Sequence, residues 1–266
     1  MKLQRLLSLT RQAADTYHMI EEGDKIAVGI SGGKASLTLL YALHGLMQFY
    51  PKKFSIIGIT VDLGLGNLNL EPVQQLCESL SIPYSIVSTE IGTVLFDIRQ
   101  ESNPCSLCAK MRKGALNTKA KELGCNKIAL GHHFDDAIET TLMSVLYGGQ
   151  YNTMMPKLHS TNFPGMELIR PLYLVKEEAI LEWKEYNHLR FLQCACRFTE
   201  QIAKEKAMEE GVHTSKRQEI KELIRELKKI NPNVDINIFR SAENVNLDAC
   251  IGYVKDGKRH RFTEEY

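Results

Sequence analysis

A strand, a glycine turn and a helix follow one another between Lys25 and Leu40, and this run constrains the fold more than any other part of the chain. It reads KIAVGISGGKASLTLL. Gly32 and Gly33 tolerate backbone angles that a side chain forbids, so phosphate oxygens can approach the turn closely. The N–H groups and the dipole at the start of the helix favour an anion there. The run therefore predicts an α/β domain with a pyrophosphate site.

Three side chains of the turn strengthen this prediction. Ser31 and Ser36 add hydroxyl donors, and Lys34 adds a mobile positive charge. The turn is not a Walker A loop, because the four residues between its two glycines are missing. A plain surface turn is the alternative, but the coincidence of strand, Ser-flanked loop and helix favours phosphate binding.

Strands and helices alternate through the first half of the chain, which predicts a doubly wound parallel sheet. Ligands of such sheets bind at the carboxyl ends of the strands. The loops at 31–34, 62–64 and 131–136 should meet there, and they bring Asp62, Gly131 and His132 to the site. The expected strands are 25–30, 54–64, 84–90 and 126–133, and the expected helices are 3–21, 36–49, 72–82, 105–123 and 135–149.

Length and composition bound the organisation. The chain has 266 residues, 44% of them hydrophobic, which predicts one large domain at 1–198 and a helical extension at 199–266. The extension begins with a charged stretch, for which a solvated helix pair is favoured over a role in oligomer or RNA contacts. No apolar run approaches the roughly 20 residues that span a bilayer. We therefore expect a cytoplasmic protein without a membrane partner.

Cysteines form two close pairs. The chain has seven cysteines, and in a reducing compartment these favour thiolate chemistry or metal binding over disulfides. Cys105 and Cys108 are spaced C-x-x-C at the start of a helix, where thiolates are favoured. Cys194 and Cys196 form the second pair. Three or four of these sulfurs could hold zinc or an iron–sulfur cluster, while a redox dithiol and unrelated buried cysteines are the alternatives.

A basic helix follows the first pair. No acidic residue occurs between 102 and 121, although the net charge of the whole chain is only +1. Such a local basic face suits phosphate contacts with RNA, and a merely soluble helix face is equally compatible with it. Its candidate tRNA-binding residues are Lys110, Arg112, Lys113 and Lys119.

Acidic and histidine side chains gather in LGHHFDDAIETTL, at residues 130–142. Asp135, Asp136 and Glu139 follow a predicted strand and begin a helix. We expect one or more of them to position Mg²⁺ or to act as the reacting base. Carboxylates that serve only the helix N-terminus are the alternative.

Five segments, in the same order, resemble the tRNA 2-thiocytidine synthetase family of the PP-loop ATP pyrophosphatases. They cover about residues 25–200. The segments are SGGK, PCSLCAKMRKGAL, ALGHHFDDAIETTLMSVLYGG, MPKLHS and IRPLYLVKEEAI.

The resemblance implies an adenine nucleotide alpha hydrolase-like fold and an enzyme that uses Mg-ATP. It would adenylate the position-2 carbonyl of cytidine 32 in the tRNA anticodon loop, and sulfur would then displace AMP. It further implies a sulfur donor such as a cysteine desulfurase, and a homodimer. The ATP-binding residues would be Ser31, Gly32, Gly33, Lys34, Ser36, Asp62, Gly131 and His132.

The family also implies a 4Fe–4S cluster. Its ligands carry over to Cys105, Cys108 and one of Cys194 or Cys196. Cys194 is preferred, because the later ligand of the relatives is the first member of its pair. Their later pair is usually C-x-x-C, whereas this one is C-x-C. The related tRNA 2-thiouridine enzymes typically carry terminal zinc modules that this chain lacks.

Ala35 departs from the family, which has Asp at this position of the loop beside the ATP phosphates. With Lys34 and Asp136, position 35 belongs to the expected catalytic set. Loss of its carboxylate should weaken placement of Mg²⁺ and stabilisation of the transferring group. We expect ATP binding with poor turnover, and the intact surroundings favour a disabled variant over a naturally weakened homologue. A PP-loop enzyme for another nucleoside or small molecule, and a non-catalytic binding module, are the rival functions.

Overall fold

The computed structural model describes residues 3–66, 69–95, 104–187 and 215–264. The chain forms two compact units. The first comprises Met1–Ala137 and Met155–Thr214, and the second comprises Ile138–Met154 and Ser215–Tyr266. The predicted boundary at 198/199 lies outside the described residues and stays a prediction. No described helix combines the length and the apolar character that crossing a membrane requires.

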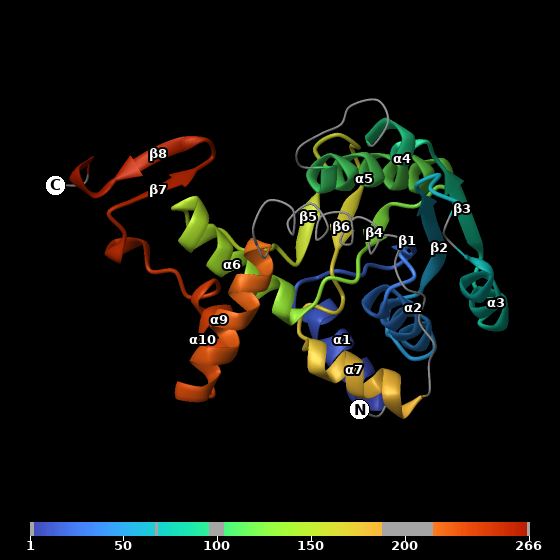
Figure 1. Cartoon of the computed structure of the whole chain (residues 1–266), viewed down its shortest axis with the longest axis horizontal. Coiled ribbons are helices and arrows are strands. Elements are labelled where there is room, and N and C mark those ends of the chain that lie inside the picture. The colour runs from blue at the N-terminus through green and yellow to red at the C-terminus, as the bar shows by residue number, and fades with distance from the viewer. Residues whose placement is uncertain (1–2, 67–68, 96–103, 188–214, 265–266) are drawn as a thin grey trace, which may run out of the picture. The chain divides into compact units, whose positions relative to one another are not determined.

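A six-stranded sheet, in the order β3-β2-β1-β4-β6-β5, organises the first unit (Figure 1). Neighbouring strands are parallel except β5, which pairs antiparallel with β6. This confirms the predicted doubly wound sheet. The strands are β1 Asp24–Gly29, β2 Phe54–Asp62, β3 Tyr84–Ser88, β4 Lys127–Ala129, β5 Lys157–His159 and β6 Glu167–Ile169.

The strand order creates a switch point beside β1. The chain runs from β1 outward through β2 to β3, then returns to place β4 on the other side of β1. Loops after β1 and β4 therefore diverge at the carboxyl edge, which is where such sheets bind ligands. Ile26, Ala27 and Val28 of β1 are fully buried, as expected of a strand covered on both faces.

Helices cover both faces of the sheet. Helices α1, α2 and α7 pack against one another on one face, and α5 lies on the other (Figure 1). Trp183 of α7 is 2% exposed and packs edge-on against Tyr41 of α2, with ring centroids 5.1 Å apart. The helices of this unit are α1 Leu3–Thr16, α2 Lys34–Met47, α3 Glu71–Ser79, α4 Ile91–Thr93, α5 Pro104–Glu122 and α7 Glu177–Tyr186.

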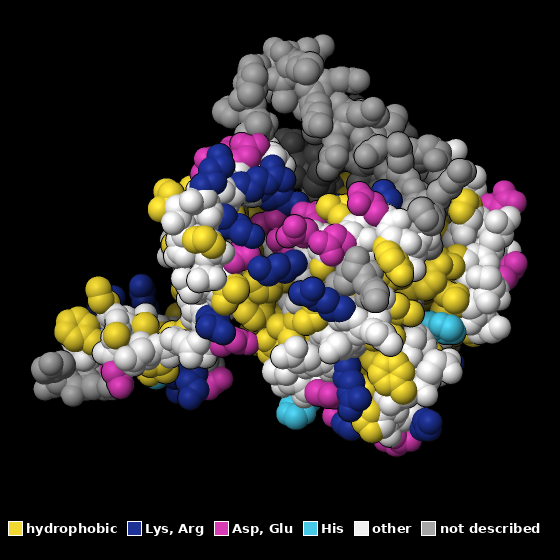
Figure 2. Space-filling view, turned by 90° about the horizontal axis from the view of Figure 1, so that it is seen from below, with side chains coloured by type: hydrophobic (Ala, Val, Ile, Leu, Met, Phe, Trp, Pro, Cys, Tyr) yellow, Lys and Arg dark blue, Asp and Glu magenta, His cyan; other side chains and the backbone are white. Residues whose placement is uncertain are grey.

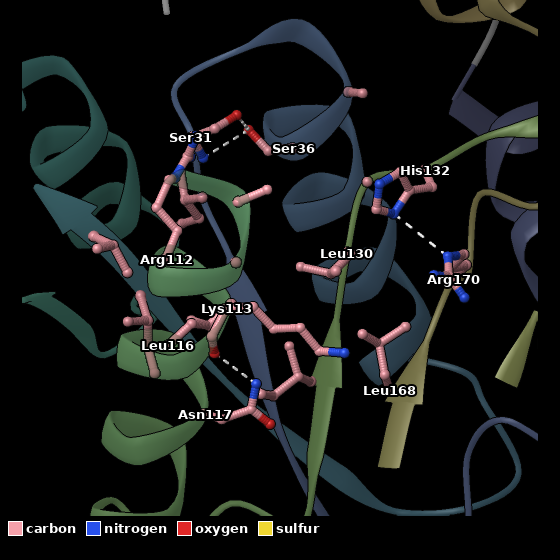
Figure 3. A pocket seen from close by; sticks show the side chains of 18 residues that line it. Ser31, Ser36, Arg112, Lys113, Leu116, Asn117, Leu130, His132, Leu168 and Arg170 are labelled. Carbon is pink, nitrogen blue, oxygen red and sulfur yellow. Dashed lines mark hydrogen bonds between the residues drawn. The ribbon is translucent and has the colours of Figure 1, made fainter. Parts of the chain in front are cut away.

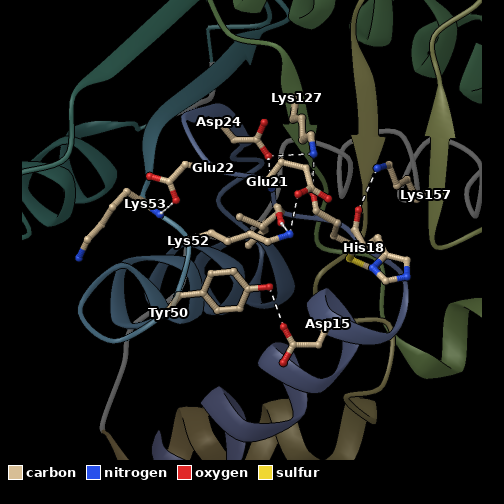
Figure 4. A network of polar contacts seen from close by, with 12 residues as sticks. Asp15, His18, Glu21, Glu22, Asp24, Tyr50, Lys52, Lys53, Lys127 and Lys157 are labelled. Atoms are coloured by element: carbon tan, nitrogen blue, oxygen red, sulfur yellow. Dashed lines mark hydrogen bonds and ion pairs between the residues drawn. The ribbon is translucent and has the colours of Figure 1, made fainter.

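A buried charge network joins the amino ends of β1, β4 and β6, and Figure 4 shows its members Asp24 and Lys127. Lys127 begins β4 and is 3% exposed. Its Nζ lies 2.8 Å from Asp24 Oδ2 and 3.2 Å from Glu167 Oε2, and it donates to the carbonyl of Met19 at 2.9 Å. Burial alone would raise the pKa of Asp24, but hydrogen bonds from Glu21, Lys127 and Asn126 hold it below its usual value. This network ties the sheet together at the edge opposite the switch point.

The second unit is mainly helical and ends in a hairpin. Helix α6 begins in the first unit and continues here from Ile138. Ser215 caps α9 by accepting a hydrogen bond from the N–H of Gln218, and Ile220 and Ile224 are the buried residues of α9. Of the predicted helical stretch at 199–230, residues 199–214 lie outside the described part. The elements are α6 Phe134–Gly148, α9 Lys216–Ile230, α10 Val234–Ser241, β7 Gly252–Lys255 and β8 Lys258–Arg261.

Candidate nucleotide-binding and thiolation site

The glycine turn forms a compact anion cradle between β1 and α2. Gly32 has a φ of 79°, which few other residues tolerate. The Ser36 hydroxyl donates to the carbonyl of Gly33 at 2.9 Å and accepts from the N–H of Ser31 at 3.2 Å. The N-cap residue of α2 is Gly33, which has no side chain to satisfy the first N–H groups of the helix. Those groups are therefore available to an anion.

A pocket of about 510 Å³ opens beside this cradle (Figure 3). Its walls come from the carboxyl ends of β1, β2, β4 and β6 and from one side of α5. Most of the lining is apolar, which suits a flat heterocycle such as adenine. The polar lining residues are Ser31, Ser36, Arg112, Lys113, Asn117, His132 and Arg170, and the apolar ones include Ile30, Ile59, Val61, Leu116, Leu130 and Leu168.

Gly131 holds the loop after β4 directly against the glycine turn. A Cβ at this position would lie 2.8 Å from the carbonyl carbon of Ala35 and 3.0 Å from the backbone nitrogen of Ser36. No side chain fits in that space, so the close approach of the two backbones depends on glycine. Gly131 and Ala35 both line the pocket, in agreement with the predicted convergence of these loops.

Lys34 of the turn forms an ion pair with Glu177 at the start of α7. Lys34 Nζ lies 2.7 Å from Glu177 Oε1, with the two side chains 38% and 25% exposed. The backbone N–H of Glu177 donates in turn to Asp135 Oδ2 at 2.6 Å. Lys34, which is expected to bind phosphates, is thus paired with Glu177, the first residue of α7.

His133 completes this polar cluster. Its side chain is buried, with Nδ1 3.5 Å from Asp135 Oδ2 and Nε2 3.6 Å from Asp136 Oδ2. Burial alone would lower the pKa of His133, but the two carboxylates raise it above its usual value. Asp136 Oδ2 also accepts the backbone N–H of His133 at 3.0 Å. In this structure Asp135 and Asp136 therefore stabilise a histidine and the start of a helix.

The three carboxylates considered for Mg²⁺ do not gather as one group, and the expectation that one or more of them positions the ion stays a prediction. Glu139 lies one turn further along α6, where Oε2 is 3.6 Å from Arg217 Nη1 and Oε1 is 3.6 Å from Lys221 Nζ. Its buried carboxylate therefore lies beside two cations of α9. Among the described residues, no three His, Cys, Asp or Glu side chains form a group that could hold a metal ion.

His132 and Arg170 line the far side of the pocket (Figure 3). Arg170 Nε donates to His132 Nδ1 at 3.4 Å, and its Nη1 donates to the carbonyl of Met155. The guanidinium is largely buried, because Arg170 is only 8% exposed. A fixed positive charge at this depth suits an anionic or carbonyl-bearing ligand.

The C-x-x-C motif lies near the start of α5, one residue after Pro104. Cys108 packs beside the buried cluster of Leu63, Ile91 and Leu95, near the carboxyl ends of β2 and β3. The next residue, Ala109, lines the pocket together with Arg112 and Lys113. Two thiols three residues apart at a helix start are a suitable part of a cluster-binding set. Cys194 and Cys196 lie outside the described residues, so the choice between them stays a prediction.

The other predicted site residues take different places. The Asp62 carboxylate accepts the N–H of Gly64 at 3.0 Å, and its neighbour Val61 is the residue that lines the pocket. Lys119 Nζ pairs with Glu122 at 3.3 Å, while Lys110 is exposed.

Sequence reasoning did not assign Glu177, Arg170 or Asn117 to the site. Glu177 and Arg170 occur in IRPLYLVKEEAI, which is one of the five segments that resemble the family. No residue of this segment was predicted to have a role in the site. The adjacent acids Glu177 and Glu178 were the available signal for Glu177, whereas nothing local distinguishes Asn117.

Comparisons with known proteins agree with this geometry. A PP-loop domain family matches residues 5–202. A tRNA-cytidine(32) 2-sulfurtransferase of Geobacter sulfurreducens is 31% identical, with 92% of this chain and 91% of that protein covered. One from Alkalilimnicola ehrlichii is 36% identical over 91% of this chain and 73% of that protein.

Among solved structures, the U34-tRNA thiolase NcsA from Methanococcus maripaludis with its [4Fe-4S] cluster is 26% identical, with a TM-score of 0.68. The match covers 89% of this chain and 76% of that one. The likeness in sequence extends over nearly the whole chain and its PP-loop, so this protein belongs to the tRNA-cytidine(32) 2-sulfurtransferase family of PP-loop proteins.

Proposed function

We propose that this protein is an ATP-dependent tRNA sulfurtransferase that replaces the position-2 oxygen of cytidine 32 with sulfur. One observation carries the proposal. The helix that begins with Cys105 and Cys108 also lines the pocket formed by the glycine turn. Nucleotide activation and thiolate chemistry would then take place at one edge of the sheet, in a chain whose relatives are tRNA-cytidine(32) 2-sulfurtransferases.

Different residues of the pocket would bind the phosphates and the adenine of ATP. The N–H groups at the start of α2 and the Lys34 ammonium would hold the phosphates. The apolar walls of the pocket would hold adenine. Adenylation serves the reaction because a carbonyl oxygen leaves poorly, whereas AMP is a stable leaving group. Arg112 and Arg170 lie in the same pocket and would stabilise the negative charge that develops during this transfer.

Cys105 and Cys108, with Cys194 or Cys196, would hold the iron–sulfur cluster. When bound, the cluster supplies an iron without a cysteine ligand, at which sulfur can be presented. Which of Asp135, Asp136 and Glu139 positions Mg²⁺ stays a prediction. The sulfur donor and the homodimer stay predictions.

Ala35 should limit turnover. It lines the pocket beside the glycine turn, so a carboxylate at this position would face bound phosphates. We propose that this chain binds ATP and reacts slowly because that carboxylate is missing.

The test is thiolation of a tRNA transcript by anaerobically purified protein with ATP and sulfide, read by mass spectrometry of the nucleosides. We expect 2-thiocytidine from the transcript and none from one with uridine at position 32. Ala35→Asp should raise the rate by about 10²-fold or more, the scale of a lost electrostatic contact. Ala35→Asn is the uncharged control. If no variant forms 2-thiocytidine while ATP is still cleaved without tRNA, another substrate class replaces this proposal.

A further inference from the structure

The C-terminal hairpin is a small, regular structure in the second unit. Strands β7 and β8 are joined by Asp256 and Gly257, whose φ angles are 50° and 75°. Two consecutive positive φ angles characterise the tight turn that matches strand twist. Val254 lies opposite Arg259, and Lys255 lies opposite Lys258. The backbone therefore fixes the side chains of the hairpin at defined positions.

The hairpin concentrates positive charge without neutralising it. Between residues 250 and 262 the sequence has four Lys or Arg residues and one acid, Asp256. All four cations are exposed, and none forms a side-chain hydrogen bond or ion pair with another described residue. Like charges directly opposite across a ladder destabilise it. The cations are Lys255, Lys258, Arg259 and Arg261.

Aromatic and apolar side chains lie among these cations. Tyr253 and His260 stack with ring centroids 4.8 Å apart and planes at 14°. Ile251, Val254 and Phe262 are 82%, 70% and 53% exposed. The hairpin lies at the left of Figure 2, where hydrophobic side chains and Lys or Arg side chains are next to one another. A two-stranded hairpin is marginally stable by itself, so this surface is suited to being covered by a partner.

The hairpin also lines a broad hollow within the second unit. Arg259 and Arg261 share this hollow, of about 1440 Å³, with Tyr151 and Asn152. Guanidinium groups next to aromatic and amide side chains are typical of surfaces that hold a phosphate backbone and stack on bases.

We propose that the hairpin at residues 251–262 binds the tRNA substrate by its sugar–phosphate backbone, an inference that rests on the proposed function. A polyanion neutralises the four cations and releases its own counterions. A second copy of this chain is disfavoured as occupant, because symmetric pairing through the hairpin would bring two sets of four cations together.

The test compares two matched charge removals. Lys258→Gln/Arg259→Gln removes one Lys and one Arg from the hairpin. Arg225→Gln/Lys229→Gln removes the same two charges from exposed positions on α9. Binding of a tRNA transcript is measured over a range of salt. For the hairpin variant we expect affinity about tenfold weaker and a log–log salt slope shallower by about 1.5, from two lost phosphate contacts. The α9 variant should match the unsubstituted protein.

A second measurement does not depend on how the variant folds. Hydrogen exchange of the unsubstituted protein should slow at residues 252–261 when the tRNA is added. Two results would overturn the inference while leaving the proposed function intact: tRNA binding and thiolation with no such protection, or equal losses in both variants. If the hairpin variant bound tRNA normally but no longer self-associated, the hairpin would instead be an interface between copies of this chain. If the unsubstituted protein binds no tRNA, both proposals fail.

Discussion

Lys34 Nζ lies 2.7 Å from Glu177 Oε1, so the cation of the glycine turn is already paired before any nucleotide arrives. The two residues are 143 positions apart in the chain. Asp135 accepts a hydrogen bond from the backbone N–H of Glu177. This contact keeps the Glu177 carboxylate near the site where phosphates would bind. A triphosphate must then compete with Glu177 for the lysine.

Glu177→Gln should strengthen ATP binding. The substitution removes both the competing partner of Lys34 and a negative charge near the phosphates. A partly exposed pair of this kind contributes up to about 1 kcal/mol, which corresponds to up to about fivefold in affinity. Calorimetry with a non-hydrolysable ATP analogue measures it. Glu178→Gln, at the exposed neighbouring position, is the matched control, and equal affinities of the two variants would contradict the competition.

Gly131→Ala should weaken ATP binding severely. Its Cβ would lie 2.8 Å from the Ala35 carbonyl carbon, a contact with backbone that cannot move aside cheaply. The loop after β4 must then separate from α2 and widen the pocket. The control is Gly114→Ala within α5, where an added Cβ meets nothing within 4 Å. That control should bind ATP normally and be stabilised by about 0.5 to 1 kcal/mol. Equal ATP affinity in both variants would show that the close approach is not required.

Cys105→Ser and Cys108→Ser should each abolish the broad brown absorbance and most of the bound iron of anaerobically purified protein. A thiolate is the ligand that these clusters need. Cys77→Ala is the control, because burial raises the pKa of Cys77 to about 11 and the thiol stays protonated. Binding of the ATP analogue should persist in all three variants. Colourless protein containing zinc would contradict the cluster assignment.

Lys127→Met should lower the free energy of unfolding by about 3 to 5 kcal/mol, since Asp24 would remain buried without its cation. Chemical denaturation measures the loss. Lys229→Met removes a lysine whose pair with Glu226 is 70% and 67% exposed, and it should change stability by less than about 1 kcal/mol. Similar losses for the two variants would mean that the buried network contributes little.

The same network predicts a pH dependence. The pKa of Asp24 is lower in the folded protein than its usual value. Its contribution is therefore fully present above the unfolded pKa of about 3.9, and it disappears as the pH falls through the folded value. The difference in stability between the unsubstituted protein and Lys127→Met should accordingly shrink in acid. A difference that stays constant below pH 4 would contradict this linkage.

Local sequence determined the strand, glycine turn and helix of residues 25–40, because Gly-Gly geometry and apolar periodicity act over a few residues. Alternation of strands and helices likewise predicted the parallel sheet and the meeting of residues 31–34 with 131–136. The Asp256-Gly257 pair between short alternating strands was a hairpin signal that the sequence contained and that our interpretation did not use.

Tertiary structure alone decided which distant charges meet. Nothing near Lys34 in the sequence indicates Glu177, and nothing near His132 indicates Arg170, because both contacts depend on where β6 and α7 return to the sheet. Glu139 has the spacing of a metal ligand beside Asp136, yet its carboxylate faces Arg217 and Lys221. Spacing along a helix determines only the direction in which a side chain points. The residue that it contacts depends on which other segment packs against that side of the helix.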